Sequence, residues 1–347
     1  LEAAAEWDFG GVPVRSGLGR LTFVGGEGDV AVMPRPSQLV ACKPGQDDPR
    51  ITKLETSAAH VTADAANDRV ALWSSSRSQL VEADGTTRDL AVAALSALTF
   101  CQSGDLAVGT QSGRLKRLTA SGEETFDLRV GAAVLAVAQS PVDGHLLVLC
   151  ADGSLTKVNQ AGEIVASHEF SRSVVAQPDV VGDEGAMEGA AAPQSDELFW
   201  EKFGKTFQLR ATAQGPVLFH GMGRILRLDD QLEVTAEAHL GQELTDVQPL
   251  GDGLLATEAQ GTAVVLDGQL KKTHRIPLGS RMARVGAGSD GPVIFDADGD
   301  CVLLRAADGT VTAKAAVYPE PRALAVSADG ARGAVLLDTR LLLFDLR

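Results

Sequence analysis

Side chains that could perform chemistry are scattered along this 347-residue sequence rather than grouped. No two of its six histidines have the spacing of metal ligands. Asp-Gly pairs, as at Asp152 and Asp298, could supply calcium ligands or catalytic carboxylates, but the preference of Asp-Gly for tight turns already explains them. Neither a G-x-S-x-G nucleophile motif nor a P-loop occurs. We therefore predict no catalytic residues, no metal and no cofactor, and we expect that the protein is not an enzyme.

The four cysteines, Cys42, Cys101, Cys150 and Cys301, lie in or beside apolar runs and form no closely spaced pairs. This arrangement is typical of small buried side chains in a reducing compartment, so we expect an intracellular protein, cytoplasmic or nuclear. A disulfide between distant parts of the chain stays open as an alternative. The sequence begins at Leu1 and not at methionine, so a targeting signal could be missing from it.

The charge balance constrains the partners. The chain has 46 acidic and 31 basic residues, which gives a net charge of −15. Nucleic-acid binding proteins usually need a basic surface, so DNA or RNA is disfavoured as the main partner. No apolar run approaches the roughly 18 residues of a membrane span. These features favour protein or peptide partners, including membership of a larger assembly.

A short sequence pattern recurs eight times: an apolar run after a turn residue, a second run, a Gly or Asp turn, and a third run. The eight repeats begin at Val30, Val70, Leu106, Leu146, Val217, Leu254, Val293 and Ala334. A repeat of about 40 residues in an all-β sequence indicates a β-propeller, with one four-stranded blade for each repeat.

The clearest repeat, residues 134–170, has turns at Asp143-Gly144, Asp152-Gly153 and Ala161-Gly162 between four apolar strands. Its S-P-x-D-G and A-D-G turns resemble those of the WD40-like propeller superfamily. Residues 323–346 resemble the family again, with Phe344-Asp345 where it often has Trp-Asp. The resemblance implies a propeller whose usual partner-binding face carries the turns between second and third strands. A propeller of the quinoprotein type without its cofactor fits the period almost as well.

The two chain ends are predicted to share one blade. The last repeat stops one strand short, and the N-terminal residues 6–9 resemble the fourth strands of other repeats. An N-terminal strand that closes the C-terminal blade would also hide a sheet edge. We predict a single all-β domain over residues 1–347, with eight blades, or seven if the irregular segment 17–55 is not a true blade.

One repeat is longer than the others because residues 174–207 are inserted between the fourth and fifth blades. Residues 195–203 begin with Ser and acidic residues, which predicts a short helix at the end of a long loop. The insertion carries an aromatic cluster, which either binds a partner or folds back onto the propeller: Phe199, Trp200 and Phe203.

Arginines provide a second, weaker indication on the same face. Arg281 and Arg322 precede first strands, and Arg224 and Arg340 lie beside turns between second and third strands. Together they would form a locally basic surface able to bind carboxylates, although scattered solvated charge explains them as well. We expect a non-catalytic scaffold that binds protein segments on the face carrying the 174–207 insertion, through Phe199, Trp200, Phe203, Arg224, Arg281 and Arg322. A propeller enzyme or a small-ligand binder that uses the central channel is the alternative.

Overall fold

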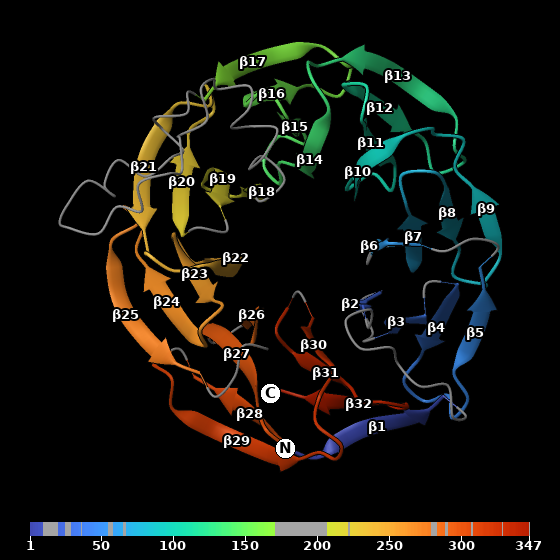
Figure 1. The fold of residues 1–347 in the computed structure, drawn as a ribbon, viewed down its shortest axis with the longest axis vertical. Coiled ribbons are helices and arrows are strands. Elements are labelled where there is room, and N and C mark those ends of the chain that lie inside the picture. Colours follow the sequence, from blue (N-terminus) through green and yellow to red (C-terminus); the bar gives the residue numbers. More distant parts are fainter. Residues whose placement is uncertain are drawn as a thin grey trace, which may run out of the picture. The chain divides into compact units, whose positions relative to one another are not determined.

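The computed structural model describes residues 1–9, 20–24, 29–35, 37–54, 58–64, 67–170, 207–220, 223–278, 283–288, 291–306, 308–327 and 329–346. Across these residues the chain forms eight antiparallel sheets of four strands each, and no helix (Figure 1). The prediction of an all-β propeller with eight blades is therefore confirmed. The irregular segment 17–55 does contain a blade, so the seven-bladed alternative is wrong.

Contacts group the chain into two compact units, Leu1–Ala93 with Gln242–Arg347, and Ala94–Gly241. We call these unit 1 and unit 2. Unit 2 holds the third, fourth and fifth blades. Their strands are β10 (Leu95–Phe100), β11 (Leu106–Thr110), β12 (Arg114–Leu118) and β13 (Glu124–Arg129); β14 (Val134–Gln139), β15 (Leu146–Cys150), β16 (Ser154–Val158) and β17 (Ile164–Glu169); β18 (Phe207–Thr212), β19 (Gly215–His220), β20 (Arg224–Leu228) and β21 (Val234–His239).

Unit 1 holds the other five blades. The first and second contain β2 (Arg20–Phe23), β3 (Val30–Arg35), β4 (Gln38–Cys42) and β5 (Arg50–Lys53), and β6 (His60–Asp64), β7 (Arg69–Trp73), β8 (Ser78–Val81) and β9 (Thr87–Asp89). The sixth and seventh contain β22 (Leu244–Leu250), β23 (Gly253–Glu258), β24 (Thr262–Leu266) and β25 (Lys272–Pro277), and β26 (Arg284–Gly288), β27 (Gly291–Asp298), β28 (Cys301–Arg305) and β29 (Val311–Ala316). The eighth contains β30 (Ala323–Val326), β31 (Arg332–Leu336), β32 (Arg340–Asp345) and β1 (Ala3–Asp8).

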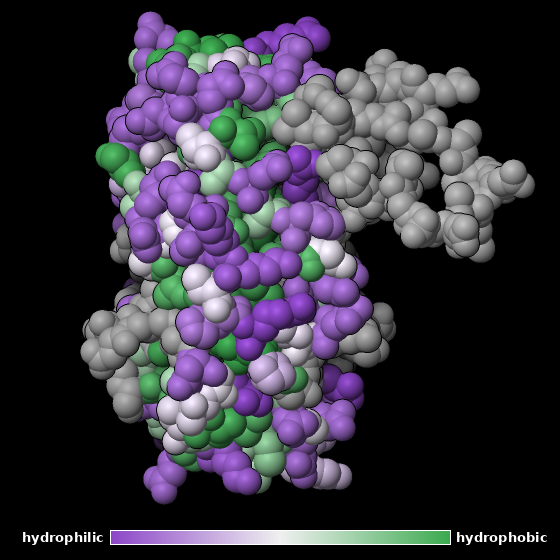
Figure 2. Space-filling model, turned by 90° about the vertical axis from the view of Figure 1, so that its left-hand side faces the viewer, coloured by the Kyte–Doolittle hydropathy of each residue, from purple (hydrophilic) through white to green (hydrophobic). Residues whose placement is uncertain are grey.

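Burial decreases from the middle strands of a blade to its fourth strand. All five residues of β15 are buried, whereas every residue of β17 is exposed or half-buried. A middle strand packs on both faces and so reads as a continuous apolar run, while an outer strand has one wet face. Hydrophilic residues accordingly cover most of the surface in Figure 2, and the hydrophobic residues form small separate patches.

The N-terminal strand completes the eighth blade as predicted. β1 pairs antiparallel with β32, with Trp7 opposite Leu341. Trp7 is only 1% exposed and joins a core cluster that includes Val32 and Val40 of the first blade. Its indole Nε1 also donates a hydrogen bond to the carbonyl of Gln46 at 2.8 Å. The closing strand thus fastens the eighth blade to the first.

Each blade has two different ends. One end carries the turn between second and third strands and the connections to neighbouring blades; we call it the connection end. The other carries the turns between first and second and between third and fourth strands; we call it the opposite end. In an antiparallel blade these turns must alternate between the ends. The described residues on either side of the insertion, at the end of β17 and the start of β18, therefore lie at connection ends. Phe207, the last residue of the range 174–207 predicted for the insertion, is the first residue of β18.

Candidate functional site

Two arginines of the predicted basic surface, the contact residue Arg322 and its neighbour Arg340, lie at the connection end of the eighth blade, in unit 1. Arg322 directly precedes β30, and its Nε donates to the Asp338 carboxylate at 2.6 Å. Arg340 is the first residue of β32 and donates to the Glu6 carboxylate at 2.7 Å. The hydrogen bond with Asp338 raises the pKa of Arg322, so this guanidinium is charged at any physiological pH. The two carboxylates lower the positive charge that a partner would meet here.

Tyr318 is the most exposed large apolar side chain among the described residues of this end. It is 79% exposed, in the connection between β29 and β30, and it is the only tyrosine of the chain. Its carbonyl oxygen accepts a hydrogen bond from Arg340, and the preceding Val317 is buried and donates to the carbonyl of Asp300 at 2.6 Å. The backbone is therefore held on both sides while the ring faces solvent. Exposed tyrosines on ordered backbone are typical centres of protein interfaces.

Tyr318 was not among the residues predicted from the sequence. The available signal was a single tyrosine followed by Pro319 and Pro321 in the connection between two blades. Proline restricts the backbone and so lowers the entropic cost of presenting a side chain. What the sequence could not give is the exposure of the ring, which depends on how the neighbouring turn packs.

Arg224, another predicted contact residue, lies in unit 2 as the first residue of β20. Its Nη2 binds the Glu237 carboxylate of β21 at 2.8 Å, and only 12% of its side chain is exposed. In the register of this blade Arg224 stands opposite His239. The side chain thus lies along the outer strand and offers little surface to a partner.

The remaining predicted contact residues, Phe199, Trp200, Phe203 and Arg281, lie outside the described residues, as does the helix predicted over 195–203. The residues on either side of the insertion are described. Phe170 and Phe207 are both buried in one core cluster of unit 2. The Phe207 ring also lies 4.2 Å from the ring of His220, centroid to centroid. Both flanks of the insertion are therefore fixed in the core.

Cysteine and metal chemistry find little support in the described parts of the chain. All four cysteines are free thiols, and Cys42, Cys101 and Cys150 are buried. Burial raises the pKa of Cys42 to about 12 and that of Cys150 to about 11, so both are protonated and unreactive at neutral pH. Over the described ranges no three His, Cys, Asp or Glu side chains are grouped as metal ligands. In the same ranges no helix has the length and apolarity to cross a bilayer.

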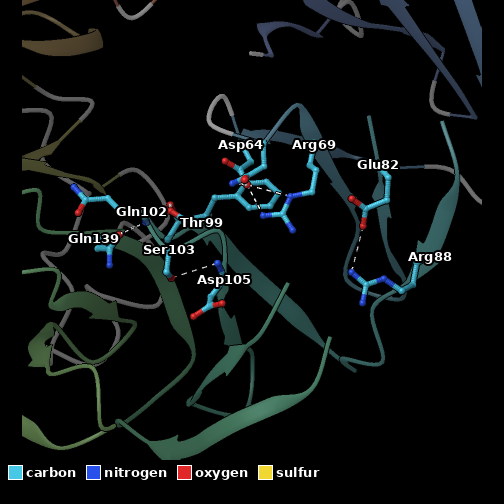
Figure 3. Close-up of polar contacts among 11 residues, drawn as sticks. Asp64, Arg69, Glu82, Arg88, Thr99, Gln102, Ser103, Asp105 and Gln139 are labelled. Atoms are coloured by element: carbon cyan, nitrogen blue, oxygen red, sulfur yellow. Dashed lines mark hydrogen bonds and ion pairs between the residues drawn. The ribbon is translucent and has the colours of Figure 1, made fainter. Parts of the chain in front are cut away.

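Polar and charged side chains fix turns and join neighbouring blades at the opposite ends of the blades. In unit 1, Arg69 binds the Asp64 carboxylate with both Nε and Nη2, and both side chains are buried (Figure 3). In unit 2, the Gln102 backbone N–H donates to the Gln139 side chain at 2.6 Å, which ties the third blade to the fourth (Figure 3). Arg117 of β12 binds Asp105 of its own blade, and its Nη1 donates to the carbonyl of Gln160 in the next.

Two cavities also lie at the opposite ends of their blades, and each unit contains one of them. The cavity of unit 2, about 290 Å³, lies between the fourth and fifth blades. The cavity of unit 1, about 250 Å³, lies between the first and second blades, and Arg50 spans it to donate to the carbonyl of Ala83. Neither cavity was predicted, because the insertion and the arginines in the sequence pointed to binding at the connection ends.

Comparisons with known proteins agree on the fold. The chain matches no family model and no curated protein. Among solved structures it is similar to the computationally designed protein Ika8, with a TM-score of 0.67 and 14% identity over 96% of this chain and 98% of that one. It is also similar to BamB from Moraxella catarrhalis, with a TM-score of 0.63 and 13% identity over 99% of both chains. The chain has a β-propeller fold. At these identities the likeness shows the fold alone, since one propeller fold serves many functions.

Proposed function

We propose that this propeller is a non-catalytic scaffold that binds segments of partner proteins at the connection ends of its blades. Exposed Tyr318 carries the proposal, because its ring is solvent-facing while its backbone is held by Arg340 and buried Val317. A tyrosine presented in this way buries a large area on binding at a small entropic cost. The Arg322–Asp338 pair lies at the same connection end and would supply a polar rim.

The 174–207 insertion forms the second part of the proposal. Loops of this length inside a compact domain are usually functional, and this one leaves from connection ends. Phe199, Trp200 and Phe203 would provide apolar contacts. The protonated, buried thiols of Cys42 and Cys150 suit a reducing environment, and we include an intracellular location in the proposal.

Affinity capture tests this function. The immobilised full chain is compared with Tyr318→Ala and with a deletion of residues 176–206, using extract from the cells that make the protein. We expect each change to remove a set of partners identified by mass spectrometry. Ile51→Ala is the matched control, because Ile51 is an exposed apolar residue on outer strand β5. If both variants retain the same partners as the control, the connection ends do not bind them.

A further inference from the structure

The cavity of unit 2 combines an apolar lining with an acidic mouth. Its apolar side is provided by the fourth blade's Val142 and Leu147 and the fifth blade's Ala211 and Pro216. Val142 is 72% exposed in the turn between β14 and β15, so its side chain is accessible to a ligand at the edge of the cavity. The volume of about 290 Å³ is near the lower limit for ligand sites and suits one or two side chains rather than a large cofactor.

The charged side of the cavity is built around Lys157. This lysine of β16 is nine-tenths buried, and its Nζ lies 2.8 Å from the Asp143 carboxylate and 3.3 Å from that of Asp230. Asp229 also lines the cavity. Two carboxylates therefore pair with one ammonium group and a third lines the same cavity, so these four side chains together carry an excess of two negative charges.

The cavity keeps hydrogen-bonding capacity in spite of these pairs. An ammonium group has three donors, and among the described residues Lys157 uses two of them, for Asp143 and Asp230. Asp230 is 86% exposed and can accept further hydrogen bonds from outside. A ligand that fits would thus place an acceptor at Lys157, a positive charge at Asp230 and an apolar group against Val142. An extended peptide has all three, because its carbonyl oxygens alternate with its side chains.

We propose that this cavity is a second docking site, which binds an extended segment of a partner protein containing an apolar residue two positions from a lysine or arginine, so that both side chains face the cavity. The apolar side chain enters between Val142 and Pro216, a backbone carbonyl accepts from Lys157, and the cationic side chain lies against Asp229 and Asp230. The excess negative charge at the mouth selects the basic residue and repels acidic segments. This site lies at the opposite ends of its blades and does not depend on the function proposed for the connection ends.

Selection from a random peptide phage library, followed by measurement on the enriched peptide, tests the proposal. The full chain is the target, and the synthetic peptide is labelled for fluorescence anisotropy. We expect a consensus with an apolar residue two positions from Lys or Arg. We expect Val142→Ser and Asp230→Asn each to raise the dissociation constant about tenfold, and added salt to raise it further. Both residues are strongly exposed, so the variants retain the fold.

Three controls separate this site from other surfaces. Val165→Ser replaces an exposed valine of β17 outside the cavity, and Asp298→Asn replaces an exposed aspartate of unit 1. Tyr318→Ala removes the proposed contact at the connection end. All three should leave the dissociation constant within about twofold of the unchanged protein. A consensus without a basic residue, no enrichment at all, or equal binding by the cavity variants and the controls would overturn the proposal.

Discussion

Replacing Trp7 tests whether the N-terminal strand really fastens the propeller. The side chain is 1% exposed, between strands of the eighth and first blades. A tryptophan buries roughly 150–250 Å², which at about 25 cal/mol per Å² corresponds to about 4–6 kcal/mol as an upper bound. Mutational series give about 3–5 kcal/mol for such truncations, including the loss of a hydrogen bond of about 1 kcal/mol. We expect Trp7→Ala to lower the free energy of unfolding by about 3–5 kcal/mol.

Trp7→Phe separates packing from hydrogen bonding. It keeps an aromatic ring in the core but loses the indole donor to Gln46, so we expect a smaller loss of about 1–2 kcal/mol. Ala4→Ser, at an exposed position of the same strand, should change stability by less than about 0.5 kcal/mol.

Urea unfolding followed by tryptophan fluorescence is a suitable assay. The chain has three tryptophans, and Trp73 lies in β7 of unit 1 with Trp7. With Trp200 replaced by Phe in every protein, Trp73 reports on unit 1 in the Trp7→Ala variant. Circular dichroism on the same samples shows whether both compact units unfold together. A loss below about 1 kcal/mol for Trp7→Ala would refute the buried closing strand.

Three further predictions address turns, charge and thiols. Gly113→Ala should cost more than about 2 kcal/mol in urea unfolding, because Gly113 has a φ of +76° and an added Cβ would lie 2.0 Å from the carbonyl oxygen of Gly131. Lys157→Met should destabilise by about 1–3 kcal/mol at neutral pH, since it leaves Asp143 half-buried without its cation. Burial acts to raise the pKa of Asp143, but hydrogen bonds from Lys157, Ser140 and the His145 backbone outweigh it and hold this pKa below the usual range. The ionised carboxylate therefore contributes to stability above about pH 4. The difference in the free energy of unfolding between Lys157→Met and the unchanged protein should shrink as the pH falls further. Under native conditions a thiol reagent should modify Cys301 first, because the other three cysteines are buried, and equal labelling of all four in mass spectrometry would contradict this.

The fold could be predicted because its signals are local and repeated. Turn residues at a nearly constant period define the blades, and the resemblance of residues 6–9 to other fourth strands predicted the closure that Trp7 and β32 make. The apolar run within residues 134–170 that became β15 is buried at all five of its residues. Each of these inferences needs only the alternation of side chains within a strand and the geometry of tight turns.

The candidate sites were less predictable because they depend on contacts between strands that are distant in sequence. Arg224 looked like a surface cation, but the register of β20 and β21 brings it to Glu237 and leaves it mostly buried. Tyr318 gave no periodic signal, and its exposure follows from the packing of the adjacent turn. Sequence spacing places a residue at one end of a blade, whereas exposure and pairing are decided by neighbouring blades.

Buried cations in the third strands of two neighbouring blades are paired in the same way. Arg117 of β12 and Lys157 of β16 occupy the same position in consecutive blades, where an apolar residue would be expected. Each binds an aspartate of its own blade and reaches the turn between third and fourth strands of the next, at Gln160 and Asp230. A buried charge is costly unless it is paired, so its presence in an apolar strand implies a partner that the repeat must also supply. At the first junction the acceptor is a backbone carbonyl, which any residue offers; at the second it is an exposed carboxylate, and that difference gives the cavity beside Lys157 its acidic mouth.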